Sequence, residues 1–106
     1  VRRMMDGGYR LAASHDEAGI ARGVAGFRCF EMLYAGPLLY VDDLVTDESN
    51  RSKGHGKALL DWLKAQARAS GCAQLHLDSG VQREKAHRFY FREGMGVNAY
   101  HFRIEL

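Results

Sequence analysis

The sequence predicts one small α/β domain, of the α+β kind, in which helices flank a mixed and mostly antiparallel sheet. Strand-like segments fill the first half, two amphipathic helical segments lie in the second half, and another strand-like segment separates those helices. The predicted order is therefore β-β-β-α-β-α-β. The length of 106 residues corresponds to a single domain over residues 1–106, and the 46% of hydrophobic residues indicates a packed core rather than disorder.

Consecutive strands with short links predict an antiparallel meander in the first half. These strands are expected at residues 9–14, 20–33 and 38–46, and the longest of them, residues 20–33, is rich in β-branched and aromatic residues. Gly23 and Gly26 interrupt the long second strand. Because glycines inside a strand are typical of a β-bulge, we expect an irregularity there.

Helical spacing replaces strand alternation at residues 57–70 and again at residues 83–93. The first of these helices places its apolar residues on one face: Leu59, Leu60, Leu63 and Ala67. Residues 73–78 alternate as a strand does, and the helical crossover predicts that this strand is parallel to residues 38–46. A last strand is expected at residues 98–106, where apolar residues alternate: Tyr100, Phe102 and Ile104.

Charge and composition exclude several classes of protein. The formal net charge is only +2 and the cations are scattered, so no nucleic-acid partner is predicted. Apolar runs fall well short of the ~18 residues of a membrane span and no signal peptide is recognisable, so no membrane partner is predicted. Cys29 and Cys72 are too few for a disulfide framework, which favours a reducing cytoplasmic location. The histidines lack a metal-ligand spacing such as HExxH, and no metal is predicted.

A glycine-rich loop, residues 51–58, joins the third predicted strand to the first helix. Gly54 and Gly56 permit a tight turn and leave room for a ligand beside the backbone. The first N–H groups of a helix lack internal partners and carry the positive end of its dipole, so the loop predicts a phosphate site. Three cations add to this charge: Arg51, Lys53 and Lys57. The spacings of a P-loop and of a dinucleotide fingerprint are absent, and the alternative is an ordinary turn with solvated cations.

The loop pattern Arg51-x-x-Gly54-x-Gly56 and the helix pattern A-x-x-F-Y-x-x-x-G-M of residues 86–95 are similar to two motifs of one family. That family is the GNAT superfamily of N-acetyltransferases, whose central fourth strand residues 39–46 also resemble. The resemblance implies an acyl-CoA N-acyltransferase fold. It also implies that acetyl-CoA is the cosubstrate and that the acetyl group passes to a primary amine of a small molecule or a protein.

The resemblance further implies which residues contact acetyl-CoA. Its pyrophosphate is expected on the glycine-rich loop: Arg51, Ser52, Lys53, Gly54, His55, Gly56 and Lys57. Backbone groups of Leu44, Val45 and Thr46 are expected to hold the pantetheine arm as an added strand. Many family members have Asn three residues before the Ala of the second helix, where this chain has Arg83. Arg83 or the neighbouring Gln82 can replace that contact, and an Arg can also reach a phosphate.

Attack of an amine on a thioester requires a proton acceptor for the amine and a proton donor for the leaving sulfur. The resemblance implies that Tyr90 is the general acid, while packing beside Phe89 is the alternative. Asp42 and Asp43 are the candidates for the base, directly or through water. Because adjacent strand residues face opposite sides, we expect only one of them to face the acceptor. The alternative is that one of these carboxylates caps a loop or pairs with a surface Arg.

The chain begins near the family's second strand, so the family's first strand and helices are not represented and the domain is short at its N-terminal end. It is either a fragment or naturally short. Residues 9–14 would then form an open sheet edge. One sheet face would also expose some of four apolar residues: Phe27, Phe30, Met32 and Tyr40. We therefore expect a homodimer or an exchanged strand, and the alternative is a monomer covered by residues 1–8. The competing function is a non-catalytic acyl-CoA-binding or regulatory module with the same fold.

Overall fold

The structure, a computed structural model, describes residues 7–46 and 54–106. The strands and helices of these residues follow one another in the predicted order, except that the predicted last strand does not form. The strands are β1 (Arg10–His15), β2 (Ala21–Met32), β3 (Gly36–Thr46) and β4 (Gln74–Leu77). The helices are α2 (His55–Ala69) and α3 (Glu84–Arg92).

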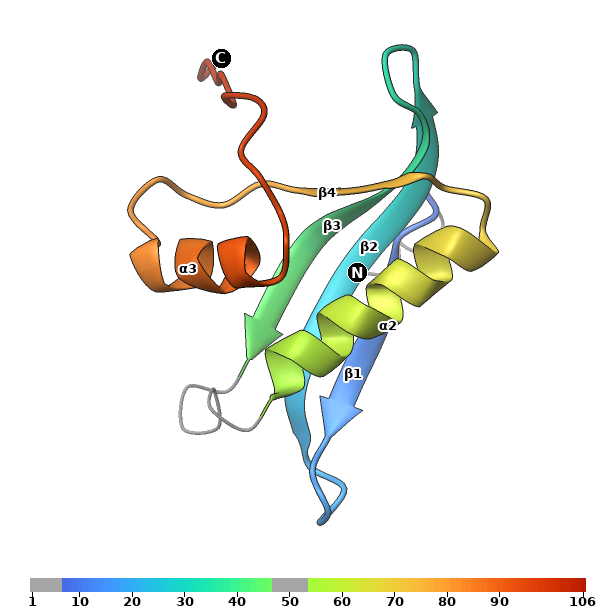
Figure 1. Ribbon diagram of the computed structural model, residues 1–106, viewed down its shortest axis with the longest axis vertical. Helices are drawn as coiled ribbons and strands as arrows, with labels where there is room; N and C mark the ends of the chain where they lie inside the picture. The colour runs from blue at the N-terminus through green and yellow to red at the C-terminus, as the bar shows by residue number, and fades with distance from the viewer. Residues whose placement is uncertain (1–6, 47–53) are drawn as a thin grey trace.

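The strands form a single sheet in the order β1-β2-β3-β4. β1 and β2 are antiparallel, β2 and β3 are antiparallel, and β3 and β4 are parallel. The predicted meander, the parallel crossover and the position of β1 at the sheet edge are therefore confirmed, as is the mixed, mostly antiparallel α+β fold class (Figure 1).

Helix α2 lies across one face of the sheet and covers the hydrophobic core (Figure 1). Its predicted apolar face is confirmed, because all four residues are buried: Leu59, Leu60, Leu63 and Ala67. Three of them, Leu59, Leu63 and Ala67, share one core cluster with the sheet residues Ala25, Phe27, Leu39 and Val41. Phe27 is therefore not on the uncovered face, since it is 0% exposed and its ring meets the edge of Trp62 at 5.7 Å between centroids.

A β-bulge interrupts the pairing of β2 with β3 next to Gly26. Gly26 pairs with Asp43 while the next residue, Phe27, pairs with Val41, so the pairing skips Asp42. The predicted irregularity near the glycines of β2 is thus confirmed, but the extra residue lies on β3. A bulge shifts the alternation of the strand by one residue, which changes the faces of the residues that follow.

The predicted last strand at residues 98–106 is wrong. These residues form neither helix nor strand and run away from the sheet (Figure 1). Phe102 is 91% exposed and Ile104 is 79% exposed. Alternating apolar residues show which side chains would share a face, but a strand also needs backbone hydrogen bonds to a neighbour. Here the segment contacts the residue after β4, since His101 Nδ1 lies 3.1 Å from an Asp78 carboxylate oxygen.

Helix α3 lies beside β3, on the side of the sheet where β4 diverges (Figure 1). Its side chains are exposed or half-buried, so it packs less tightly than α2 does. Within the described residues, neither helix is long and apolar enough to cross a membrane. The loosely packed side of the sheet next to α3 is where the predicted site residues lie.

Candidate functional site

The edge of β3 that faces α3 is paired only along its first part. Residues 38–41 pair with β4, whereas residues 42–46 continue beyond the end of β4; among the described strands, residues 43–46 pair only with β2. This leaves a run of backbone N–H and C=O groups without a sheet partner on that edge. An extended ligand can add to such an edge as a strand does.

A groove of about 1220 Å³ follows this open edge. It runs between β3, the start of α2 and helix α3, and its lining includes Leu44, Val45, Thr46, Gly54, Gly56, Lys57 and Arg83. A cavity of about 140 Å³ adjoins it and is lined by Asp42, Asp43, Asp78 and Tyr90, among others. The structure therefore brings the predicted cofactor residues of the described part, except His55, to one groove, and the predicted catalytic residues to its end.

The glycine-rich loop enters α2 through Gly54, whose φ of 82° is left-handed. Only glycine adopts this conformation without strain, which explains the first glycine of the motif. The helix hydrogen bonds begin when the N–H of Ala58 donates to the carbonyl oxygen of Gly54 over 2.9 Å. The N–H groups of residues 55–57 precede this bond and point along the helix axis toward the groove end. Arg51, Ser52 and Lys53 lie outside the described residues.

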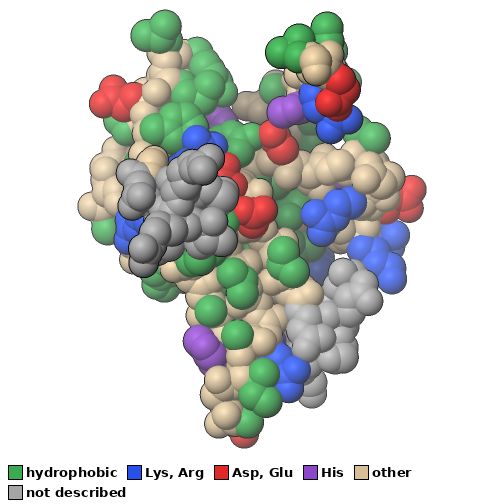
Figure 2. Space-filling view, turned by 180° about the vertical axis from the view of Figure 1, so that it is seen from behind, with side chains coloured by type: hydrophobic (Ala, Val, Ile, Leu, Met, Phe, Trp, Pro, Cys, Tyr) green, Lys and Arg blue, Asp and Glu red, His purple; other side chains and the backbone are tan. Residues whose placement is uncertain are grey.

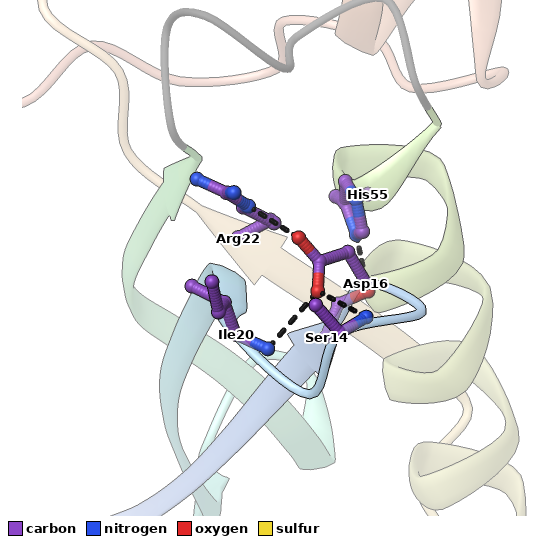
Figure 3. Close-up of polar contacts among 6 residues, drawn as sticks. Ser14, Asp16, Ile20, Arg22 and His55 are labelled. Atoms are coloured by element: carbon purple, nitrogen blue, oxygen red, sulfur yellow. Dashed lines mark hydrogen bonds and ion pairs between the residues drawn. The ribbon is translucent and has the colours of Figure 1, made fainter.

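The side chain of His55 does not enter the groove. Its Nδ1 lies 2.7 Å from the hydroxyl of Ser14 on β1 (Figure 3). Beside this contact, Asp16 accepts hydrogen bonds from the N–H groups of Ala18 and Ile20 and pairs with Arg22 over 2.8 Å (Figure 3). The His55 side chain thus fixes the start of α2 to the β1–β2 hairpin, and only the backbone of His55 is left for a phosphate.

The ammonium group of Lys57 is held by two carboxylates. Its Nζ lies 3.1 Å from Glu93 at the end of α3 and 3.4 Å from Asp61 on α2. The hydrogen bond to Glu93 contributes most to raising the pKa of Lys57. Lys57 therefore joins α2 to α3 across the groove, and its positive charge is already paired with the carboxylates of Glu93 and Asp61.

Tyr90 is half-buried on α3 and faces the cavity. Burial raises the pKa of Tyr90, and the nearby positive charge of Arg83 opposes that shift. The phenol therefore keeps its proton at neutral pH and is able to donate it. Arg83 precedes the first turn of α3 and lines both the groove and the cavity, which places its guanidinium group beside Tyr90.

Asp42 and Asp43 lie on the same face of the sheet, opposite α2, and the expectation that they point to opposite sides is wrong. The Asp42 carboxylate accepts from Arg28 Nε and Nη2, both over 2.8 Å. Arg28 is next to the core residue Phe27 on β2, so strand alternation puts Arg28 on the far face. Asp43 accepts from the hydroxyl of Tyr9 over 2.6 Å on that face. The bulge at Asp42 is the cause, since it shifts the alternation of β3 by one residue.

Figure 2 views the molecule from this side and shows acidic side chains gathered near the middle of the face. Around them lie groups that sequence analysis did not single out. Arg28 stacks on the rings of Phe30 and Tyr40, with its Cζ 4.9 Å and 5.8 Å from their centroids. The hydrogen bond to Asp43 is the main cause that raises the pKa of Tyr9 to about 12. Only contacts between distant strands reveal these partners, and no local pattern in the sequence marks them.

Comparisons with known proteins agree on one family. The family model described as "Acetyltransferase (GNAT) family" matches residues 3–96. The Bacillus subtilis protein named "Uncharacterized N-acetyltransferase YhdJ" is 40% identical over 96 residues, which is 90% of this chain and 67% of that protein. An aminoalkylphosphonate N-acetyltransferase of Salmonella typhimurium is 31% identical over 96 residues, which is 91% of this chain and 60% of that protein.

A solved structure has the same fold. An acetyltransferase of Trypanosoma brucei superposes with a TM-score of 0.81 at 28% identity, over 99% of this chain and 74% of that one. The chain thus spans about two thirds of the length of the curated relatives that it matches. The family match covers the open edge of β3, the glycine-rich loop and Tyr90 together. This chain belongs to the acetyltransferase (GNAT) family.

Proposed function

We propose that this chain binds acetyl-CoA in the groove along β3 and transfers the acetyl group to a primary amine. One observation carries the proposal: the open edge of β3, the start of α2 and Tyr90 all border a single continuous space. A long ligand with phosphates at one end and a thioester at the other matches the order of these features. Relatives named N-acetyltransferases support the reaction class.

The chain's own groups supply each contact in this proposal. The backbone N–H groups at the start of α2 bind the pyrophosphate, and the helix dipole favours its negative charge. The backbone of Leu44, Val45 and Thr46 pairs with the amide groups of the pantetheine arm. Arg83, at the junction of groove and cavity, contacts the cofactor where many family members have Asn.

The proton balance needs two groups at the cavity. A base takes one proton from the ammonium form of the amine and passes it to solvent, and the neutral nitrogen then attacks the thioester carbonyl carbon. The carbon–sulfur bond breaks as Tyr90 donates its proton to the departing sulfur, and coenzyme A leaves as the thiol. The attacking nitrogen loses its second proton, which passes through solvent to the Tyr90 phenolate, and the product is the N-acetylated amine.

Asp43 is the better base of the two adjacent carboxylates, directly or through a water. Both oxygens of Asp42 accept from the Arg28 guanidinium, so this carboxylate is already neutralised by a cation. Asp43 is exposed, and its known partner is the uncharged hydroxyl of Tyr9 on Oδ2. We therefore assign Asp42 to holding Arg28 and Asp43 to the acceptor amine.

An assay of thiol release tests the function. The purified chain is mixed with acetyl-CoA and a panel of primary amines, and calorimetry measures acetyl-CoA binding separately. Transfer to at least one amine supports the proposal, whereas binding without transfer to any of them favours a non-catalytic acyl-CoA-binding module. Asp43→Asn is expected to lower kcat by about 10²-fold, while the matched variant Asp42→Asn lowers it much less.

We also propose that the chain forms a homodimer. The outer edge of β1 has no strand beside it within the described sheet, and Leu11 on β1 is 48% exposed. The face opposite α2 carries the paired rings of Phe30 and Tyr40, 6.1 Å apart between centroids. Light scattering at micromolar concentration decides this: a mass near 11.9 kDa contradicts the dimer, and twice that mass supports it.

The free thiols of Cys29 and Cys72 suit a reducing compartment, and we propose the cytoplasm as the location of the protein.

A further inference from the structure

Tyr9 lies just before β1 and yet reaches a residue on β3, two strands away. Its side chain is nearly buried, at 6% exposure. Its hydroxyl donates to Asp43 Oδ2 over 2.6 Å, which is a short hydrogen bond to a charged acceptor. To make this contact the ring must cross over β2, because β2 lies between β1 and β3 in the sheet.

Gly26 is the position at which this crossing occurs. A Cβ atom built on Gly26 would overlap the hydroxyl and ring of Tyr9. Gly26 is also the residue of β2 that pairs with Asp43. The missing side chain of Gly26 therefore opens a passage that leads from Tyr9 directly to the Asp43 carboxylate. No backbone requirement explains this glycine, because its φ is not left-handed.

The bulge completes the arrangement. Without it, Asp42 and Asp43 would point to opposite faces; with it, both carboxylates stand on one face and each has its own partner. Asp42 pairs with a cation, Arg28, and Asp43 with a neutral donor, Tyr9. A neutral donor fixes the direction of a carboxylate without cancelling its charge, so the second oxygen of Asp43 stays available for a proton.

We propose that Tyr9 is a positioning residue that holds Asp43 toward the acceptor amine through the passage over Gly26. The proposal rests on the role of Asp43 in the proposed function. Tyr9 is suited to this part because its hydroxyl stays protonated over the whole range of an enzyme assay: its pKa, raised mainly by the hydrogen bond to Asp43, is about 12.

The other charged or titratable groups around this carboxylate are unchanged in the test. Asp42, Asp78, Arg83 and Tyr90 line the same cavity as Asp43, and Arg28 pairs with Asp42. The substitution Tyr9→Phe removes only the hydroxyl and keeps the ring over Gly26. Gly26→Ala is the companion variant, because it keeps the hydroxyl but displaces it from Asp43.

A double-mutant cycle with Asp43→Asn tests whether Tyr9 acts through Asp43. Tyr9→Phe is expected to lower kcat about tenfold in the parent chain, with an unchanged affinity for acetyl-CoA, and less than about twofold in the Asp43→Asn background. Gly26→Ala is expected to reproduce the loss. An equal factor in both backgrounds would mean that Tyr9 supports the fold alone, and the proposal would be overturned.

A second measurement does not depend on activity. In a chain with ¹³C-labelled tyrosine, the Tyr9 phenol signal is expected to titrate at lower pH in Asp43→Asn than in the parent, because the hydrogen bond to Asp43 is the main cause that raises the pKa of Tyr9 to about 12. The matched variant Asp42→Asn is expected to change the Tyr9 titration less. Identical Tyr9 titrations in the parent and in Asp43→Asn overturn the proposal whatever the activity, whereas a parent chain that transfers no acetyl group overturns the proposed function instead.

Discussion

The two halves of β3 belong to the same strand but differ in strand pairing and in exposure. Its first half, residues 38–41, pairs with strands on both sides, and Leu39 is 0% exposed beneath α2. In its second half, residues 42–46, the pairing is with β2 alone and skips Asp42, and Val45 is 64% exposed. The first half anchors the core, while the second half borders the groove. A single strand can therefore give rigidity and an open binding edge at once.

The change between these halves has two structural causes. β4 ends at Leu77, which lies opposite Val41, so the outer edge of β3 becomes open at that point. The bulge at Asp42 comes directly after Val41 and turns both carboxylates to one face. The end of a short strand and a bulge, at consecutive residues, separate the structural part of β3 from the proposed site.

The largest effect is expected in the buried half. Leu39→Ala should lower the free energy of unfolding by about 3 kcal/mol, because it removes a fully buried side chain and leaves a cavity under α2. Urea unfolding followed by circular dichroism measures this. The matched control is Val45→Ala in the open half, which should change stability by less than about 0.5 kcal/mol. Comparable losses for both variants would contradict the division of β3.

The next effect concerns catalysis at the open half. Tyr90→Phe should lower kcat by about 10²-fold, while the affinity for acetyl-CoA stays the same. Because burial raises the pKa of Tyr90, activity should persist up to the ordinary phenol range near pH 10 and fall only above it. Steady-state kinetics across pH and calorimetry measure these quantities. Unchanged turnover would show that Tyr90 packs against Phe89 and does not act as the acid.

A smaller effect is expected at the phosphate end of the groove. Gly56→Val should weaken acetyl-CoA binding about tenfold, or roughly 1.4 kcal/mol, because its side chain enters the space at the start of α2. Adding a Cβ atom here is tolerated by the fold, since the nearest atoms, on Phe89 and Thr46, would lie 3.6 Å away. Ala58→Val is the control, because Ala58 is exposed on the same helix but does not line the groove. Equal affinities in calorimetry would place the phosphates elsewhere.

Local patterns in the sequence predict the buried half well. Helical spacing identifies Leu59, Leu63 and Ala67 as the core face of α2, and the order of strands and helices predicts the parallel pairing of β3 with β4. The family resemblance identifies the glycine-rich loop and Tyr90, and both border the groove. These features are set by residues that are close in sequence, or they are identified by a sequence motif.

The open half is predicted less well, because its geometry depends on distant contacts. Two-residue alternation assigns Asp42 and Asp43 to opposite faces, and one bulge removes that distinction. Tyr9 meets Asp43 across 34 positions of sequence, and no local pattern reports such a pair. The segment at residues 98–106 fails for a related reason, since alternation cannot supply the neighbouring strand that a β-strand requires.

The smallest effect is expected where α3 is joined to α2. Lys57→Met removes the ion pairs of Lys57, whose side chain is 60% exposed, with Asp61 and with Glu93, whose side chain is 11% exposed. The urea midpoint should fall only slightly, but amide hydrogen exchange in α3 should become faster. The hydrogen bond to Glu93 raises the pKa of Lys57 above its ordinary value of 10.5, so its contribution is complete below that pH and is lost as the pH rises further. The difference between variant and parent should therefore disappear at strongly alkaline pH.

Lys64→Met is the matched control. Among the ion pairs of the described residues, Lys64 pairs only within α2, with Asp61 at 3.8 Å. Faster exchange in both variants would show that the link to Glu93 does not hold α3.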